Sequence, residues 1–470
     1  MFRQGLRLGM IRSITHKSNA IPTATVTTMT SSESKKPIDF FTGWPNPGLL
    51  PPNTLNAAAN SLLSDSSQAP SILRYGEDEG YLPLRKEVAK WLTTFYRPEH
   101  GINYKRICIT GGASQNLACV LQTFTDPVYT RNVWMVSPTY FLACRIFDDS
   151  GFAGRFRAVP EDEEGIDIDF LEQQIKASEG RAQAAGNLSP RFKPVRPWRK
   201  IYKHVIYGVP TFANPSGRVT SLRRRESLVR LARRYDALII TDDVYDFLQW
   251  SSSSSSSDKA LDSARQPRMV DVDRYLDGGP IDDFGNAVSN GSFSKIVAPG
   301  CRTGWAEGTE SLAYGLSQTG SSRSGGCPSH LVASFISQML ASNTLQDHIE
   351  YKLKPAYARR YHNLMGAINA HLLPLGLTMP EPGKDVAGGY FVWLELPKPL
   401  VADRVTKLAS REEGLIISEG PKYQVVGDEE ATSRFERNIR LCFAYADEDS
   451  LEEGVKRLAR VISRELKAEQ

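Results

Sequence analysis

The sequence has few cysteines and histidines, and neither type is arranged as in a metal site or a disulfide framework. Its six cysteines are scattered without a Cys-x-x-Cys pair, and its seven histidines form no His-x-x-x-His or His-Glu pair. We therefore expect no metal site, and we interpret the cysteines as reduced thiols in a reducing compartment.

Long apolar runs and a strong excess of one charge are also absent. No stretch approaches the roughly 18 apolar residues of a transmembrane helix, so we expect no membrane span. The 57 basic and 53 acidic side chains leave a net charge of only +4. This charge is too small to predict binding to nucleic acid.

Acidic residues are missing from the start of the chain, where the first is Glu33. The basic residues before it, among many serines and threonines, are Arg3, Arg7, Arg12 and Lys17. This composition resembles a mitochondrial targeting sequence, although disordered tails also have Ser/Thr-rich starts. We predict a leader over residues 1–35 that is either disordered or a targeting segment. The predicted location is accordingly mitochondrial or cytoplasmic.

From about Ile38 onward, short β-rich runs alternate with helical patterns. Strands are predicted at 106–110, 132–136, 204–207 and 237–241. Helices are predicted at 53–64, at 115–124 and around 228–235, where apolar residues recur on one helix face. Because the strands are hydrophobic throughout, this alternation favours a mainly parallel sheet covered by helices on both faces.

The pattern changes after about Ser342. A long helix is followed by β-rich segments at 388–394 and 437–443 and by a final charged helix. A few strands with helices on one side predict a smaller α+β domain.

Two stretches look like insertions. Residues 178–203 are rich in Arg and Lys with Pro and Gly, and they are either a solvated loop or a basic patch for a partner. Residues 251–257 are seven consecutive serines, which predict a flexible surface loop without chemistry.

The strongest chemical signal is the segment 291–305, GSFSKIVAPGCRTGW. Its lysine, Lys295, lies close in sequence to Ser292, Ser294 and Arg302. A lysine that forms a Schiff base must lose its proton, which burial or a nearby positive charge promotes. The two hydroxyls and the guanidinium suit a phosphate, which Arg binds through paired, charge-assisted hydrogen bonds.

This spacing, Ser-x-Ser-Lys-x-x-x-Pro-Gly-x-Arg-x-Gly-Trp, resembles the lysine signature of fold-type I enzymes that use pyridoxal 5'-phosphate (PLP). Among these, it is most similar to class I and II aminotransferases. The branch it resembles holds α-aminoadipate/kynurenine-type and valine–pyruvate-type transaminases, including uncharacterised fungal members. The resemblance extends over residues 38–465.

The resemblance implies an aspartate aminotransferase-like α/β fold. Its large domain would hold a mainly parallel seven-stranded sheet sandwiched by helices, and a smaller α+β domain would follow. The implied division is an N-terminal arm and helix at 36–70, the large PLP-binding domain at 71–342 and the small C-terminal domain at 343–470.

The turn 110–115 (TGGASQ) joins a predicted strand to a predicted helix. Free N–H groups and the dipole at a helix N-terminus suit an anion, and in the resembled family this turn binds the cofactor phosphate. The residues that match the family's cofactor-binding positions are Gly112, Ala113, Ser114, Tyr140, Asn214, Asp242, Tyr245, Ser292, Ser294, Lys295, Arg302 and Tyr75.

Four of these matches imply contacts with the cofactor ring. Tyr140 matches the aromatic residue that stacks on the pyridine, and Asn214 and Tyr245 match the residues that bind the 3'-oxygen. Asp242 ends a predicted strand, where a doubly wound sheet places its ligand, and it matches the partner of the pyridine nitrogen. Asp243 is the alternative acid, although the Asp-x-x-Tyr spacing favours Asp242.

Further matches imply substrate contacts and a partner subunit. Arg440 matches the residue that binds the substrate carboxylate, together with Asn214 and Gly43. Tyr75 matches the tyrosine that reaches the phosphate of the neighbouring subunit, which implies a homodimer with shared active sites. The arm from Trp44 to Leu50 and the stretch 320–330 are expected to line the pocket. Arg323 either binds a second carboxylate, which would favour aminoadipate or glutamate, or is an ordinary loop residue.

The function implied is a PLP-dependent aminotransferase that moves an amino group between an L-amino acid and a 2-oxo acid through a Schiff base on Lys295. Lys295 would act as general base and Asp242 as the group that keeps the ring cationic. A PLP-dependent carbon–sulfur β-lyase is the alternative, because both reactions begin with the same proton removal. A non-enzymatic PLP-binding regulator with a DNA-binding module is a remote alternative.

Overall fold

The computed structural model describes residues 35–253, 261–323, 325, 328–380, 385–428 and 434–469. Residues Pro37–Gln470 form one compact unit, which is described below. Most of the predicted leader, and the serines from 254 on, lie outside the described residues.

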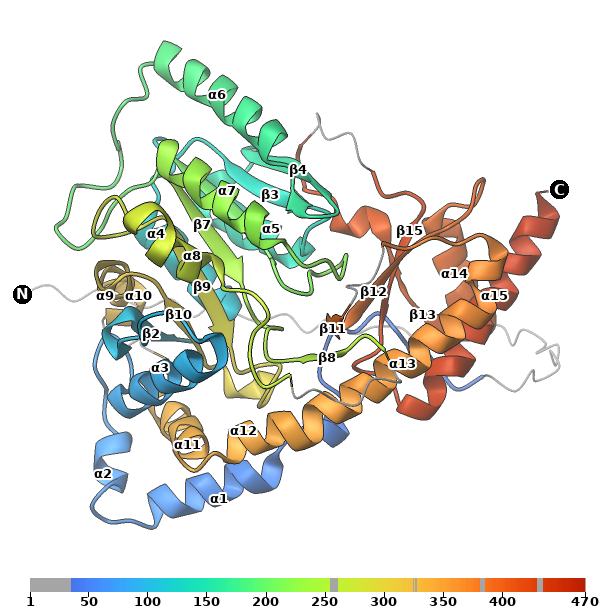
Figure 1. Cartoon of the computed structure of the whole chain (residues 1–470), viewed down its shortest axis with the longest axis horizontal. Coiled ribbons are helices and arrows are strands. Elements are labelled where there is room, and N and C mark those ends of the chain that lie inside the picture. The colour runs from blue at the N-terminus through green and yellow to red at the C-terminus, as the bar shows by residue number, and fades with distance from the viewer. Residues whose placement is uncertain are drawn as a thin grey trace, which may run out of the picture. The chain divides into compact units, whose positions relative to one another are not determined.

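An eight-stranded sheet forms the centre of this unit (Figure 1). In spatial order its strands are β2 (Ile107–Thr110), β10 (Gly304–Glu307), β9 (Ala287–Ser292), β7 (Ala237–Asp242), β6 (His204–Gly208), β3 (Val133–Ser137), β4 (Phe156–Asp162) and β5 (Gly165–Ile166). The run from β9 to β4 is parallel, whereas β10 is antiparallel to both of its neighbours. The predicted α/β class is confirmed. The two-residue strand β5, antiparallel to β4, is one more than the seven strands predicted.

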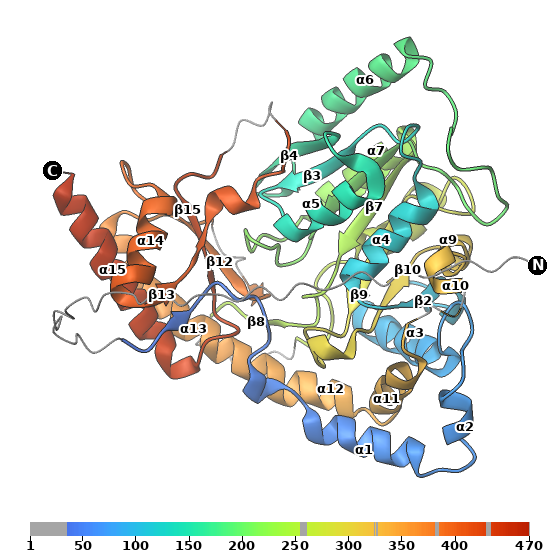
Figure 2. The same ribbon diagram turned by 180° about the vertical axis from the view of Figure 1, so that it is seen from behind.

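Strand alternation sends apolar side chains into a separate core on each face of this sheet. In β7, Leu238 and Ile240 pack into one core, while Ala237 and Ile239 pack into the other. The first core is closed by α4 (Ala113–Phe124), α5 (Phe141–Phe147) and α9 (Glu310–Ser317). The second is closed by α6 (Ile168–Ala184), α7 (Leu222–Arg234) and α8 (Met269–Tyr275). Figure 1 shows α7 and α8 in front of the sheet, and Figure 2 shows α4 and α5 on the opposite side.

A smaller antiparallel sheet follows, in the order β12 (Phe391–Glu395), β15 (Asn438–Cys442) and β14 (Ser418–Glu419). Its helices are α13 (Lys354–His371), α14 (Ala402–Glu413) and α15 (Leu451–Ala468). The N-terminal strand β1 (Ile38–Asp39) pairs with β13 (Leu415–Ile416) of this part, and β11 (Val386–Gly388) pairs with β8 (Gln249–Ser251). The predicted α+β character is therefore present, while the domain boundaries stay predictions.

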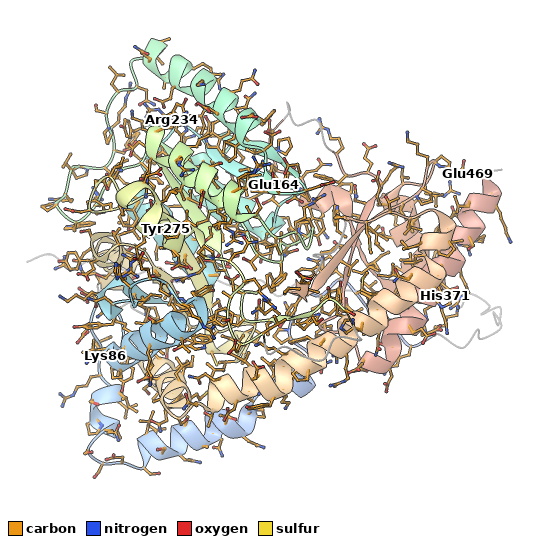
Figure 3. The ribbon with its side chains drawn as sticks, in the orientation of Figure 1. Lys86, Glu164, Arg234, Tyr275, His371 and Glu469 are labelled. Carbon is orange, nitrogen blue, oxygen red and sulfur yellow. The ribbon has the colours of Figure 1, made fainter. Side chains whose placement is uncertain are left out.

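The remaining helices are α1 (Pro52–Leu63), α2 (Ala69–Ile72), α3 (Leu82–Tyr96), α10 (Gly320–Arg323), α11 (His330–Ala341) and α12 (Thr344–His348). Charged side chains such as Lys86 of α3 and Arg234 of α7 point outward (Figure 3). No helix among the described residues is long and apolar enough to cross a membrane.

The interpretation of 178–203 as a solvated loop is wrong in part. Its first residues, through Ala184, belong to helix α6. Further along, Lys200 forms ion pairs with Asp236 at 2.8 Å and Asp282 at 2.7 Å. These ion pairs hold the end of this segment against the body of the protein.

Arg268 lies in a buried charge cluster beside the sheet. Its guanidinium is 2.9 Å from Asp271, 2.7 Å from Glu307 and 3.9 Å from the centre of the Tyr96 ring, and only 1% of the side chain is exposed. Removing one member of such a cluster leaves buried charges without compensation.

We expect Arg268→Ala to lower the free energy of unfolding by about 3–5 kcal/mol, as measured by urea denaturation. Arg230→Ala is the matched control, because Arg230 pairs with Asp277 on the surface, and it should change stability little. Equal effects of the two substitutions would contradict a special role for the buried cluster.

Candidate active site

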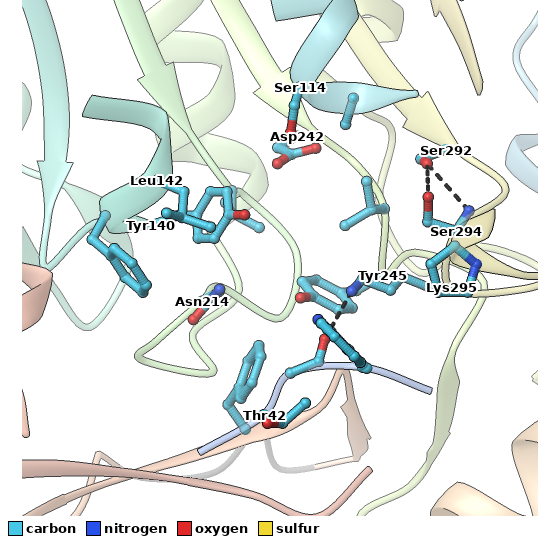
Figure 4. A pocket seen from close by; sticks show the side chains of 18 of the residues that line it. Thr42, Ser114, Tyr140, Leu142, Asn214, Asp242, Tyr245, Ser292, Ser294 and Lys295 are labelled. Atoms are coloured by element: carbon cyan, nitrogen blue, oxygen red, sulfur yellow. Dashed lines mark hydrogen bonds between the residues drawn. The ribbon is translucent and has the colours of Figure 1, made fainter. Parts of the chain in front are cut away.

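A cavity of about 330 Å³ lies where the central strands end (Figure 4). Its wall includes the carboxyl ends of β7 and β9 and the loops after β3 and β6. Parallel strands place such ligand crevices at their carboxyl ends. The predicted site residues that line it are Gly43, Ala113, Ser114, Tyr140, Asn214, Asp242, Tyr245, Ser292, Ser294, Lys295, Arg302 and Arg440.

Lys295 is the amine of this cavity. Its Nζ donates a hydrogen bond to the carbonyl oxygen of Gly43 at 2.9 Å and lies 5.5 Å from the centre of the Tyr390 ring. Burial lowers the pKa of Lys295 to about 8, because a low-dielectric surrounding disfavours the ammonium. A substantial fraction of the amine is therefore neutral near physiological pH.

Asp242 and Asp243 differ in what surrounds them. Asp242 lines the cavity: its Oδ2 accepts from the Tyr207 hydroxyl at 3.3 Å, and its Oδ1 is buried without a hydrogen-bond partner among the described residues. Asp243 is outside the lining and accepts hydrogen bonds from Thr241 at 2.8 Å and Ser289 at 2.5 Å. The Oδ1 of Asp243 is likewise buried without a partner among the described residues, but only Asp242 belongs to the cavity lining.

The environment of Asp242 favours its neutral form. Burial, followed by the charge of Asp243, raises the pKa of Asp242 to about 7. An unpartnered buried carboxylate is costly, so a positively charged or N–H-bearing ligand would be stabilised beside it.

One end of the cavity has the features of an anion-binding site. The N-terminus of α4 presents Ala113 and Ser114, and Arg302 donates to the carbonyl oxygen of Gly111 at 3.1 Å. Gly112, which precedes the helix, has a φ of +95°, and a Cβ there would lie 2.8 Å from the Arg302 guanidinium. The absence of a side chain at Gly112 thus lets a guanidinium approach a helix N-terminus, which combines two sources of positive potential.

Two serines complete this end of the cavity. The Ser292 hydroxyl is 3.0 Å from the Ser294 hydroxyl and accepts from the Ser294 N–H at 3.2 Å, as the dashed lines in Figure 4 mark. Both lie on the segment that leads from β9 to Lys295. The anion-binding end and the reactive amine are therefore held by one short piece of chain.

Arg440 supplies a third cation, on strand β15 of the smaller sheet. Its side chain donates to Asn214 Oδ1 at 3.0 Å and to the carbonyl oxygen of Phe41, and its guanidinium lies 4.1 Å from the centre of the Phe391 ring. It is 4% exposed, and its Nε has no hydrogen-bond partner among the described residues. A buried guanidinium in this state suits a carboxylate ligand.

The N-terminal arm contacts both Lys295 and Arg440, and sequence reasoning missed the residue that shapes it. The Asp39 carboxylate accepts the N–H groups of Phe41 at 2.8 Å and Thr42 at 2.9 Å and the Thr42 hydroxyl at 2.7 Å. An Asp that bonds the backbone two residues on is a turn signal that could have been used.

Apolar residues form much of the remaining cavity wall, and most of them were not predicted. The missed lining residues are Phe41, Thr42, Phe141, Leu142, Val209, Val244, Pro299 and Phe391. Of the arm predicted from Trp44 to Leu50, only Trp44 lines the cavity. Pro299 belongs to the lysine signature, whereas the positions of the other missed residues depend on tertiary packing and no local motif marks them.

Other predicted residues lie elsewhere. Tyr75 is 85% exposed and is outside the cavity of its own chain. Arg323 is 3.7 Å from Asp78, and no described residue of 320–330 lines this cavity. The predicted roles of Tyr75 across a subunit boundary and of Arg323 at a second carboxylate stay untested.

The chain is similar to aminotransferases along most of its length. The family model "Aminotransferase class I and II" matches residues 45–458. Uncharacterized protein YER152C of Saccharomyces cerevisiae is 33% identical over 90% of this chain and 96% of its own length. The 2-aminoadipate transaminase of Thermus thermophilus is 28% identical over 90% of each chain.

Solved structures agree with this similarity. The multiple substrate aminotransferase of Thermococcus profundus superimposes with a TM-score of 0.72 at 25% identity, over 94% of this chain and 96% of that one. The α-aminoadipate aminotransferase LysN of Thermus thermophilus, complexed with N-(5'-phosphopyridoxyl)-L-leucine, gives 0.70 at 26% identity, over 92% of this chain and 93% of that one.

We expect Asp242→Asn to stabilise the ligand-free protein at neutral and higher pH. Because the pKa of Asp242 is raised from 3.8 to about 7, the folded protein keeps a proton that the unfolded chain has released. Between these two values the wild type therefore loses stability as pH rises, by roughly 1.4 kcal/mol per pH unit at most. Asn carries no charge and escapes this loss. Urea midpoints at about pH 5 and about pH 8 measure the difference, and parallel pH dependences of the two proteins would contradict it.

Proposed function

Since this chain belongs to the class I and II aminotransferase family, we propose that Lys295 holds PLP in the cavity described above. The chain is a PLP-dependent transaminase, an enzyme that moves an amino group between an amino acid and a 2-oxo acid. The lyase alternative is not favoured, because the named relatives with an assigned activity are transaminases.

The residues present fit PLP, and the orphaned Oδ1 of Asp242 carries this conclusion. A buried carboxyl oxygen without a partner matches the N–H of a protonated pyridine, whose positive charge would return the pKa of Asp242 toward its ordinary range. When bound, PLP supplies an electron-accepting ring that stabilises negative charge on the substrate Cα. Asp242 keeps that ring protonated.

The other cavity residues divide the remaining contacts. The N–H groups at the start of α4, the hydroxyls of Ser292 and Ser294 and the Arg302 guanidinium would hold the phosphate. Asn214 and Tyr245 would bind the ring oxygen, and Tyr140 would cover one ring face.

Arg440 binds the substrate carboxylate in this proposal, and Asn214 holds its guanidinium in place. A carboxylate fixed at Arg440 orients the substrate Cα–H bond within the cavity that Lys295 lines. Because the pKa of Lys295 is about 8, part of its amine is neutral near physiological pH and can accept the Cα proton. The same Nζ can then donate this proton back.

A homodimer completes the proposal. Tyr75 is exposed on its own chain and is available to reach a partner subunit's phosphate site. The substrates are two small molecules, an amino acid and a 2-oxo acid.

The covalent role of Lys295 is tested by borohydride reduction in the presence of PLP, followed by mass spectrometry. We expect a stable cofactor adduct on the peptide that contains Lys295, and a labelling rate that rises with pH and levels off above about pH 8, as the amine loses its proton. Lys295→Ala should lose this adduct and lower the transamination rate by about a hundredfold or more. An adduct on another lysine, or full turnover by the variant, would overturn the assignment.

We expect Asp39→Ala to raise KM for the amino acid and to lower kcat/KM by roughly tenfold, because the turn that sets the Phe41 and Gly43 carbonyls loses three hydrogen bonds. Asp39→Asn is the matched control, since its Oδ1 can still accept both backbone N–H groups. The Asn variant should therefore keep most of the activity. Steady-state kinetics of the three proteins distinguish this role from general destabilisation, which would lower the fraction of active enzyme and hence the apparent kcat while leaving KM unchanged.

A further inference from the structure

We propose that Lys422 binds the second carboxylate of dicarboxylic substrates, and this inference rests on the proposed function. Lys422 lies in the short helix η8 (Gly420–Tyr423), next to the smaller sheet. It is exposed, and none of the sequence motifs pointed to it.

Each of the three cationic side chains that line the cavity already has a role in the proposed function. Lys295 is the reactive amine, Arg302 is at the anion-binding end and Arg440 faces the α-carboxylate. The lining contains no further Lys, Arg or His, and much of the rest of its wall is apolar. A second carboxylate would therefore need a cation at the rim.

Lys422 is at this rim. Its Nζ lies 4.6 Å from the centre of the Phe41 ring and 5.7 Å from the centre of the Phe141 ring, and both rings line the cavity. In the part of the chain that the structure describes, no acidic side chain forms an ion pair with it. Its ammonium therefore has only aromatic rings as partners among the described residues. A cation held over rings can still bind a carboxylate from the solvent side.

Arg440 and Lys422 are placed on the same residue of the arm. Arg440 donates to the carbonyl oxygen of Phe41, and Lys422 covers its ring. The two cations therefore contact the same arm residue, one at its backbone carbonyl and the other at its ring.

The backbone around Lys422 is fixed to the active-site wall. The carbonyl oxygen of Tyr423 accepts the N–H of Thr139 at 2.9 Å, and the Tyr423 ring packs edge-on against Phe141 at 5.7 Å. The Arg440 guanidinium lies 5.1 Å from the centre of the same Tyr423 ring. Lys422 therefore projects from a segment whose position relative to Arg440 is set by packing.

Arg323, which the sequence suggested for this role, is placed differently. It pairs with Asp78 at 3.7 Å and does not line the cavity of its own chain. Uncharged side chains need neither cation, because the rings of Phe41, Trp44, Phe141 and Phe391 offer them an apolar wall. Lys422 would thus act only on substrates that carry a second negative charge.

The test uses the holoenzyme and follows the first half-reaction, in which one amino donor converts the bound cofactor. Lys422→Met keeps an apolar stem and removes the charge. We expect the second-order rate constant to fall about tenfold for glutamate or its neighbours aspartate and 2-aminoadipate, as loss of a charge-assisted hydrogen bond predicts, and to change less than about twofold for leucine and phenylalanine. The donor with the largest fall gives the chain length that spans Arg440 and Lys422.

Arg323→Met is the matched control and should leave all five donors unaffected. An equal fall for charged and uncharged donors would assign Lys422 a structural role, and a selective fall in the Arg323 variant would transfer the role to that residue. Either result overturns the proposal, as does a wild type that converts only monocarboxylic donors. Absence of amino transfer from every donor would instead refute the proposed function itself.

Discussion

Burial of an amine and a carboxyl group in one cavity is the constraint around which this structure is built. Lys295 is half-buried and Asp242 is buried, and desolvation moves the pKa of the first down to about 8 and of the second up to about 7. In the ligand-free protein both pKa values therefore lie close to physiological pH. With its ordinary pKa of 10.5 Lys295 would be a poorer proton acceptor near pH 7, so the same desolvation that costs folding stability serves the chemistry.

The fold meets this constraint by dividing charges between the two faces of one strand end. Asp242 faces the cavity with an unsatisfied oxygen, while its neighbour Asp243 bonds Thr241 and Ser289 on the other side. Behind Asp243, Arg268 compensates further buried acids. Burial raises the pKa of Asp243, and the charge of Asp243 in turn raises the pKa of Asp242. Asp242 is the last residue of β7 and Asp243 the first after it, so the end of the strand separates these roles.

Local motifs predicted the parts of the site in which neighbouring residues act together, as in the segment from Ser292 to Arg302 and the Asp242–Tyr245 pair. Strands β9 and β10 were not predicted, because AVSNGS and GWAE contain few β-branched residues and owe their strand form to their sheet neighbours. The close approach of Arg302 to Gly112 and the position of Lys422 over Phe41 join segments far apart in the chain. Such contacts depend on tertiary packing and leave no pattern in one sequence.

The N-terminal arm shows how these distant contacts are coupled. Its strand β1 pairs with β13 next to the smaller sheet, yet the carbonyl of Gly43 accepts from Lys295, which follows β9 of the central sheet, and the carbonyl of Phe41 accepts from Arg440 on β15. Lys422 covers the ring of Phe41 from a third segment. A substrate carboxylate that accepts a hydrogen bond from Arg440 competes with the Phe41 carbonyl for the guanidinium. Displacement of the Phe41 backbone would also move the Phe41 ring and, two residues on, the Gly43 carbonyl that accepts from Lys295. Recognition of the substrate and the position of the reactive amine are therefore linked through one short turn, whose shape depends on the carboxylate of Asp39.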